Sequence, residues 1–200
     1  YPFERLSPFA FEDLTYFAIK QCIENEKHWN NFNKVQSLGG IKDKGRDCIL
    51  KNNNLNLGLI QCKHSEKLTK LSKPILIKEI VKFLLYSIKQ PELIYKIDDF
   101  KYFIFSSSGL SSDTIEFIDN FNEKILDEEK LSSWVNSVIK QYSTISDLKD
   151  YDSIKSKLDP LLLKIHVENL TVKDFNLLLN KDYNSNLVQT FYSVKKVLDE

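Results

Sequence analysis

The sequence predicts an α/β domain in which helices flank a mixed central sheet, followed by a mostly helical C-terminal extension. Patterns typical of helices and strands follow one another along the first half of the chain in the order helix, strand, strand, helix, strand, helix. This order favours a sheet covered by helices. The 200 residues are 42% hydrophobic and 12% aromatic, with only five Gly and five Pro. Such a composition is typical of a folded domain that can bury a core.

The first predicted helix starts near residue 11. Two acidic residues, Glu12 and Asp13, would lie in its first turn, where negative charge suits the helix dipole. Apolar side chains recur at helical spacing: Phe11, Leu14, Phe17 or Ala18, and Cys22.

A β-hairpin is predicted next, after a Gly-rich turn at residues 38–45. Its strands are residues 46–50 and 55–63, and three asparagines separate them. A turn centred on Asn53 would pair position 47 near position 59.

Strand alternation decides which hairpin side chains share a face. It predicts that Gln61 lies diagonally next to Asp47, with Lys63 on the same face of its strand as Gln61. Cys62 points the other way. Asp47, Gln61 and Lys63 are therefore expected to converge at one end of the hairpin.

The remaining elements follow from apolar periodicity. Residues 74–90 carry an apolar stripe at helical spacing, and Pro74 suits a first helical turn. An aromatic and β-branched run at 101–105 predicts a strand. The later predicted elements are helices at 113–126, 131–141, 147–158, 172–179 and 187–198, and a strand at 162–170.

The pattern predicts a core at residues 1–110 and a mainly helical extension at 111–200. The extension would complete the domain, and it would serve oligomerisation or linkage to further domains. Because the chain starts at Tyr1 and contains no Met, we expect it to be excised from a longer polypeptide. Three cysteines and no signal-peptide pattern predict a cytoplasmic location. No apolar run approaches the roughly 20 residues of a membrane helix, so no membrane partner is expected.

Charge is unevenly distributed along the chain. The formal net charge is zero, from 28 basic and 28 acidic residues, which by itself argues against nucleic-acid binding. Residues 34–90, however, hold 12 basic and four acidic residues, a balance of +8. The basic segment coincides with the hairpin and with the helix that follows it.

A carboxylate and an amide oxygen at one end of a hairpin are hard ligands that suit Mg²⁺. A neighbouring lysine can orient a water nucleophile or stabilise charge that develops on a phosphoryl group. An alternative interpretation of Asp47, Gln61 and Lys63 is an exposed polar face of a half-buried hairpin.

The motif order resembles the PD-(D/E)XK nuclease superfamily, specifically its Mrr-like restriction endonuclease branch. The matching residues are Gly45-Arg46-Asp47, then Gln61-Cys62-Lys63 after 13 residues, with Phe11-Glu12-Asp13-Leu14 upstream. The likeness covers about residues 9–108 and implies a restriction-endonuclease-like fold. Gln in place of the second acidic residue is common in that branch.

The resemblance implies a role for each matching residue. Asp47 would be the principal metal-binding carboxylate, and Gln61 would contribute its side-chain oxygen. The backbone carbonyl of Cys62 would be a further ligand, and Lys63 would be the catalytic lysine. Glu12 would complete the site for Mg²⁺ or Mn²⁺, with Asp13 as the competing choice.

The resemblance also implies an activity and a setting. The expected activity is metal-dependent endonucleolytic hydrolysis of DNA phosphodiester bonds, with double-stranded DNA favoured, although the residues themselves do not exclude RNA or single strands. Nucleases of this kind occur as effector domains of larger bacterial antiphage defence proteins, which implies a homo-oligomer on activation. The alternative is a catalytically inactive nuclease-like module that binds nucleic acid or a protein partner.

Four residues near the predicted site are candidates for contact with nucleic acid. Lys44 and Arg46 would hold phosphates, although each is equally well explained as a solvated turn residue. His64 and Lys67 follow the Gln61-Cys62-Lys63 motif directly. They would add further contacts to substrate.

Overall fold

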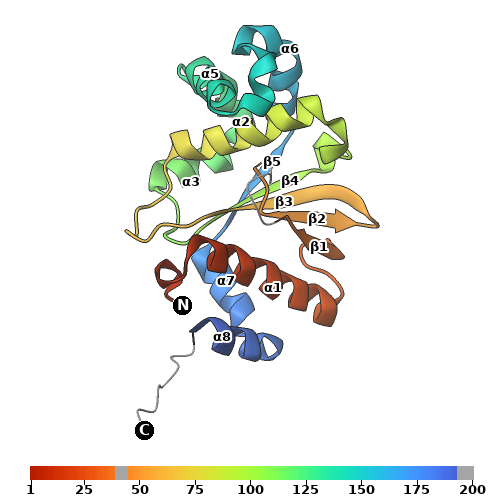
Figure 1. Cartoon of the computed structure of the whole chain (residues 1–200), viewed down its shortest axis with the longest axis vertical. Coiled ribbons are helices and arrows are strands. Elements are labelled where there is room, and N and C mark those ends of the chain that lie inside the picture. Colours follow the sequence, from red (N-terminus) through yellow and green to blue (C-terminus); the bar gives the residue numbers. More distant parts are fainter. Residues whose placement is uncertain (39–44, 193–200) are drawn as a thin grey trace.

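The computed structural model describes residues 1–38 and 45–192, and in these residues two layers of helices enclose a five-stranded sheet (Figure 1). The strands are β1 (Lys34–Ser37), β2 (Cys48–Asn52), β3 (Leu55–Lys63), β4 (Lys101–Ser106) and β5 (His166–Leu170). The helices are α1 (Pro8–Glu26), α2 (Lys73–Lys89), α3 (Ser112–Asp119), α4 (Phe121–Lys124), α5 (Leu131–Gln141), α6 (Tyr151–Leu162), α7 (Val172–Leu179) and α8 (Ser185–Tyr192).

The sheet is mixed, as predicted. Its strand order is β1-β2-β3-β4-β5; the first three strands pair antiparallel, and β3, β4 and β5 pair parallel. Helix α2 connects β3 to β4, whereas the whole segment from α3 to α6 lies between β4 and β5. The predicted α/β fold class is therefore confirmed. No helix in the described part of the chain is long and apolar enough to cross a membrane.

Alternation along the strands divides the core into two clusters, one on each face of the sheet. On β4, Tyr102 and Ile104 face the cluster formed with α2, α5 and α6. Their neighbours Phe103 and Phe105 face the cluster formed with α1, α7 and α8. Figure 1 shows these helices as separate layers above and below the sheet.

Helix α1 begins earlier than the apolar pattern predicts. Ser7 is the N-cap, its Oγ accepts a hydrogen bond of 3.2 Å from the Ala10 amide, and Pro8 starts the helix. Glu12 and Asp13 consequently lie beyond the first turn, which contains no acidic residue. The prediction that the helix dipole favours them there is wrong, because the N-terminal signal is the Ser-Pro pair.

The hairpin between β2 and β3 has a different register from the predicted one. Asn53 and Asn54 both have positive φ, +48° and +66°, and these two residues form the turn. The turn is therefore not centred on Asn53. The register also shifts by a bulge at Leu50/Lys51. Position 59 consequently pairs with Ile49, and the predicted pairing of 59 near position 47 is wrong.

Two further elements were not predicted or were only partly predicted. Strand β1 was missed because Val35 is its only buried residue, so the alternation is too short to detect. The extension contributes β5, which is shorter than the predicted strand at 162–170. It also contributes α7 and α8, which cover the same face of the sheet as α1. The predicted helix at 187–198 is described only to residue 192, where α8 ends.

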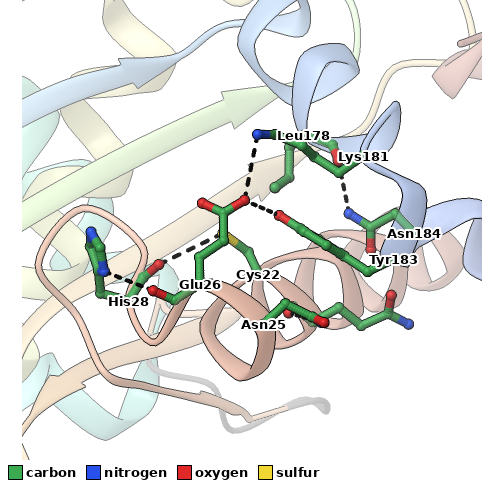
Figure 2. A network of polar contacts seen from close by, with 9 residues as sticks. Cys22, Asn25, Glu26, His28, Leu178, Lys181, Tyr183 and Asn184 are labelled. Atoms are coloured by element: carbon green, nitrogen blue, oxygen red, sulfur yellow. Dashed lines mark hydrogen bonds and ion pairs between the residues drawn. The ribbon is translucent and has the colours of Figure 1, made fainter.

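A polar network fastens the C-terminal helices to the end of α1 (Figure 2). Tyr183, between α7 and α8, donates a hydrogen bond of 2.7 Å to the Glu26 carboxylate, and the Lys181 ammonium lies 3.5 Å from the same oxygen. His28 Nδ1 lies 3.0 Å from the backbone carbonyl of Glu26. Asn184 Nδ2 donates a hydrogen bond of 2.8 Å to the Leu178 carbonyl and orders the connection from α7 to α8.

Replacing Tyr183 by Phe is expected to lower thermal stability at neutral pH and to have little effect in acid. The hydrogen bond from Tyr183, assisted by Lys181, lowers the pKa of Glu26 below its ordinary value of 4.5. A lowered pKa stabilises the fold fully above the unfolded value, and this contribution is lost as pH falls through the folded pKa. Melting temperatures of both proteins, measured from neutral pH to below 4.5, check the expectation.

The matched control is Tyr95→Phe, because Tyr95 is 60% exposed. Its melting curve should follow that of the unmodified chain at every pH. A deficit in Tyr183→Phe that persists unchanged in acid would contradict the role assigned to the Glu26 carboxylate.

Candidate active site

The structure brings the three hairpin residues to the side of the sheet that α2 covers. Cys48 and Cys62 belong to the core cluster beneath α1, so alternation turns Asp47, Gln61 and Lys63 towards α2. Asp47 precedes the first residue of β2, and its amide donates a hydrogen bond of 3.1 Å to the Ile60 carbonyl. This bond holds Asp47 beside Gln61, as the shared-face prediction requires.

Gly45 places the Gly45-Arg46-Asp47 segment directly against α2. Its φ is +80°, a conformation that L side chains rarely adopt, and a Cβ there would lie 3.5 Å from the Phe83 nitrogen of α2. Glycine therefore allows the chain to turn beneath α2 and to enter β2 with Asp47 in place.

The Asp47 carboxylate is buried and closely held. It is 5% exposed. Its Oδ2 accepts a hydrogen bond of 2.5 Å from the Cys62 amide and another of 2.8 Å from Gln61 Nε2. Hydrogen bonds to a carboxylate favour its charged form, so the site presents a fixed negative charge at the end of the hairpin.

The Gln61 amide has a defined orientation because both of its partners are acceptors. Nε2 donates to Asp47 Oδ2 and, at 3.2 Å, to the Cys62 carbonyl. Oε1 must then point away from both, and it is buried without a hydrogen-bond partner in the described residues. A buried amide oxygen without a donor costs roughly 1–3 kcal/mol.

This donor set fits a hard divalent cation. The amide NH₂ bridges two oxygens, on Asp47 and Cys62, that the family resemblance assigns to the metal. The third oxygen of that assignment, Gln61 Oε1, would face the same position after a half-turn of the amide, which exchanges it with the NH₂. Carboxylate, amide and backbone carbonyl oxygens suit Mg²⁺ and Mn²⁺. The residues present therefore fit the metal that the resemblance implies.

Lys63 is held by a partner that the sequence did not suggest. Its Nζ lies 2.8 Å from Oε1 of Glu79 on α2, and the Glu79 side chain is 16% exposed. Glu79 was not predicted as a site residue. The available signal was that it is the only acidic residue of an otherwise basic, apolar-striped helix.

Glu12 lies on α1, which packs against the opposite face of the sheet. Of the two acidic candidates, Glu12 is half-buried and Asp13 is exposed. The charge of Glu12 acts on the thiols of both Cys48 and Cys62, whereas that of Asp13 acts on Cys48. The charge of Glu12 therefore reaches both cysteines of the hairpin.

The thiols near the site remain protonated. Burial raises the pKa of Cys48 and Cys62 well above the ordinary value, and the negative charge of Asp47 raises both further. Both side chains are buried and none of the three cysteines forms a disulfide. Neutral thiols are poor metal ligands, so the ligand assigned at Cys62 remains its backbone carbonyl.

The residues expected to contact nucleic acid lie in different environments. Arg46 is 7% exposed, so it is not the solvated turn residue of the sequence-based alternative. His64 is half-buried, its Nε2 lies 3.1 Å from the Phe3 carbonyl, and its ring packs against Phe11. Lys67 is exposed and is the most accessible of the described candidates. Lys44 lies outside the described residues.

Several lysines of the basic segment have intramolecular partners. Lys73 pairs with Glu128, and Lys89 lies 2.7 Å from Asp147. Lys82 lies over the Tyr142 ring, 5.1 Å from its centroid. The charge surplus of the segment is thus partly compensated by residues of the C-terminal extension.

Within the described residues, no group of three or more His, Cys, Asp or Glu side chains is arranged to hold a metal ion. The candidate centre differs from such a group because it uses an amide and a backbone carbonyl beside its carboxylate. In comparisons with known proteins, no family model, no curated protein and no solved structure matches the chain.

Proposed function

We propose that the chain is a metal-dependent endonuclease that hydrolyses phosphodiester bonds in DNA. The observation that carries the proposal is the Gln61 amide. It joins Asp47 Oδ2 to the Cys62 carbonyl while its own oxygen is buried without a donor. The same face of β3 carries Lys63. This combination supports a cation site with an adjacent ammonium group.

Each residue would have a separate task. Asp47, Gln61 and the Cys62 carbonyl would hold Mg²⁺ or Mn²⁺, with Glu12 as the carboxylate supplied by α1. The bound cation would supply Lewis acidity and a water of lowered pKa. The Lys63 ammonium would orient the attacking water or stabilise the charge that develops on the phosphoryl oxygens. Lys67 would contact the phosphate backbone, which positions substrate without reading its sequence.

Other parts of the proposal rest on the family resemblance and on composition. They are double-stranded DNA as substrate, a cytoplasmic location and a role as effector domain of a larger bacterial antiphage defence protein. They also include self-assembly on activation and further domains in the same polypeptide. The buried, unpaired state of all three cysteines agrees with a reducing compartment.

Plasmid cleavage with Mg²⁺ and with Mn²⁺ tests the activity, with Lys63→Ala compared against the unmodified chain. Protein concentrations should be high enough to drive self-association. We expect metal-dependent nicking or linearisation, reduced about 100-fold or more in Lys63→Ala because a preorganised charge at the reacting phosphate is lost.

Lys124→Ala is the matched control, because Lys124 also pairs with a glutamate, Glu116 at 3.1 Å. It should cleave like the unmodified chain. Equal cleavage in Lys63→Ala would contradict the assignment of Lys63.

One observation favours the alternative, a catalytically inactive module that binds nucleic acid or a protein. Lys63 pairs with Glu79, and Gln61 donates a hydrogen bond to Asp47. These polar side chains therefore already have partners within the protein. The alternative predicts that neither cation binds at Asp47 and that no cleavage occurs at any protein concentration.

A further inference from the structure

We propose that Glu79 of α2 is a ligand of the same metal site and supplies the negative charge that Gln61 lacks. The inference deepens the proposed function and rests on it, because it assigns one more residue to the cation. It also predicts a second role for Glu79, which is to position Lys63.

The first argument is placement. Lys63 lies on the same face of β3 as Gln61, two residues away, and its Nζ is 2.8 Å from Glu79 Oε1. One helical turn after Glu79, α2 is in contact distance of Gly45, which leads directly into Asp47. Both strands of the site therefore approach the same turn of α2.

The second argument is an unsatisfied atom. Glu79 Oε1 is bound to Lys63, but Oε2 is buried and has no hydrogen-bond partner in the described residues. Gln61 Oε1 is in the same condition on the same side of the sheet. A cation bound on this side of the sheet would give such buried acceptor oxygens the partner they lack.

The third argument is charge. Asp47 and Gln61 together bring one negative charge to a divalent cation, and the number of ligand charges is one of the properties that set cation affinity. Glu12 is on α1, on the opposite side of the sheet from α2. Glu79 already lies on the side to which Asp47, Gln61 and Lys63 point. Glu79 would therefore add its charge from the side of α2, beside the charge that Glu12 supplies from α1.

Direct titration of Mn²⁺ into the full chain tests the inference, with calorimetry and the loss of free Mn²⁺ paramagnetic resonance signal as readouts. The variants are Glu79→Gln, which removes the charge, and Glu79→Asp, which keeps the charge but withdraws the carboxylate by one methylene. We expect both variants to weaken Mn²⁺ binding by about 10-fold or more, since loss of even an outer-shell partner of a metal ligand has an effect of that size.

Glu116→Gln is the control, because Glu116 also pairs with a lysine but is 75% exposed on α3. It should bind Mn²⁺ like the unmodified chain. Circular dichroism and thermal melting of every variant will identify any loss of fold.

The outcomes separate this inference from the proposed function. If Asp47→Asn abolishes Mn²⁺ binding while both Glu79 variants bind normally, Glu79 is not a ligand and the proposed function stands. If only Glu79→Gln weakens binding, Glu79 acts through its charge at a distance, and ligation is ruled out. If the unmodified chain binds no Mn²⁺, or if Asp47→Asn binds it unchanged, both the ligand assignment and the metal-dependent function fail.

Discussion

Asp47→Asn is expected to abolish cleavage and Mn²⁺ binding while leaving a folded protein. The substitution removes the fixed negative charge that Oδ2 presents beside Gln61 and the Cys62 carbonyl. A metal contributes several kcal/mol to transition-state stabilisation, and each 1.4 kcal/mol is about a tenfold change in rate. We therefore expect the cleavage rate to fall by about three orders of magnitude or more.

The same substitution should also lower stability. The hydrogen bonds that Asp47 Oδ2 accepts from Gln61 and from the Cys62 amide are charge-assisted, and such bonds contribute about 1.5–3 kcal/mol each. Asparagine can still accept one of them. A reduction of about 2 kcal/mol in the free energy of unfolding, measured by urea denaturation, is expected.

Asp150→Ala serves as the matched control for loss of stability. Asp150 is the N-cap of α6, and its carboxylate accepts a hydrogen bond of 2.9 Å from the Ser153 amide. Losing an N-cap costs about 1 kcal/mol, so this variant is destabilised at a place far from the hairpin. Normal cleavage by Asp150→Ala together with inactive Asp47→Asn would assign the loss to the site, whereas active Asp47→Asn would refute the assignment.

A fragment ending at residue 110 is expected not to fold, although it contains every residue of the family resemblance. It would lose β5 and the helices that complete both core clusters. Phe105, which is fully buried, would lose the Phe175 ring whose centroid is 4.6 Å away. Exposing one large apolar side chain costs about 1.5–3 kcal/mol. About five such exposures equal the whole stability of an ordinary domain, roughly 5–15 kcal/mol.

The fragment is compared with a chain that ends at residue 192, which keeps every described element. Circular dichroism, amide proton dispersion and limited proteolysis should show a cooperative fold only in the longer chain. A fragment 1–110 that melts cooperatively would show that the two halves are independent folding units.

The fold class could be predicted because the main elements carry strong periodic signals. The stripe of α2 and the aromatic run of β4 are in place, and the boundaries of α5 and α7 agree with the predicted ones. Weak signals failed. Strand β1 has only one buried residue, and the hairpin register depends on a bulge that no pattern of hydrophobicity records.

The site was predicted in outline but not in its contacts. Alternation alone places Asp47, Gln61 and Lys63 on one side, because a period of two needs only a local pattern. The partner of Lys63 is distant in sequence and comes from α2. It depends on how the helix packs over the sheet, and one sequence does not specify that packing.

The order of strands in the sheet has a consequence for how the protein reaches its native state. Strands β1, β2 and β3 are neighbours in sequence and in space, so they can pair with short loop closures. Strand β5 can join β4 only after residues 107–165 have been synthesised and drawn together, and such non-local parallel pairing is slow. The hairpin that carries Asp47 and Gln61 should form early. The open edge of β4 should remain the slowest and most aggregation-prone part of the folding chain.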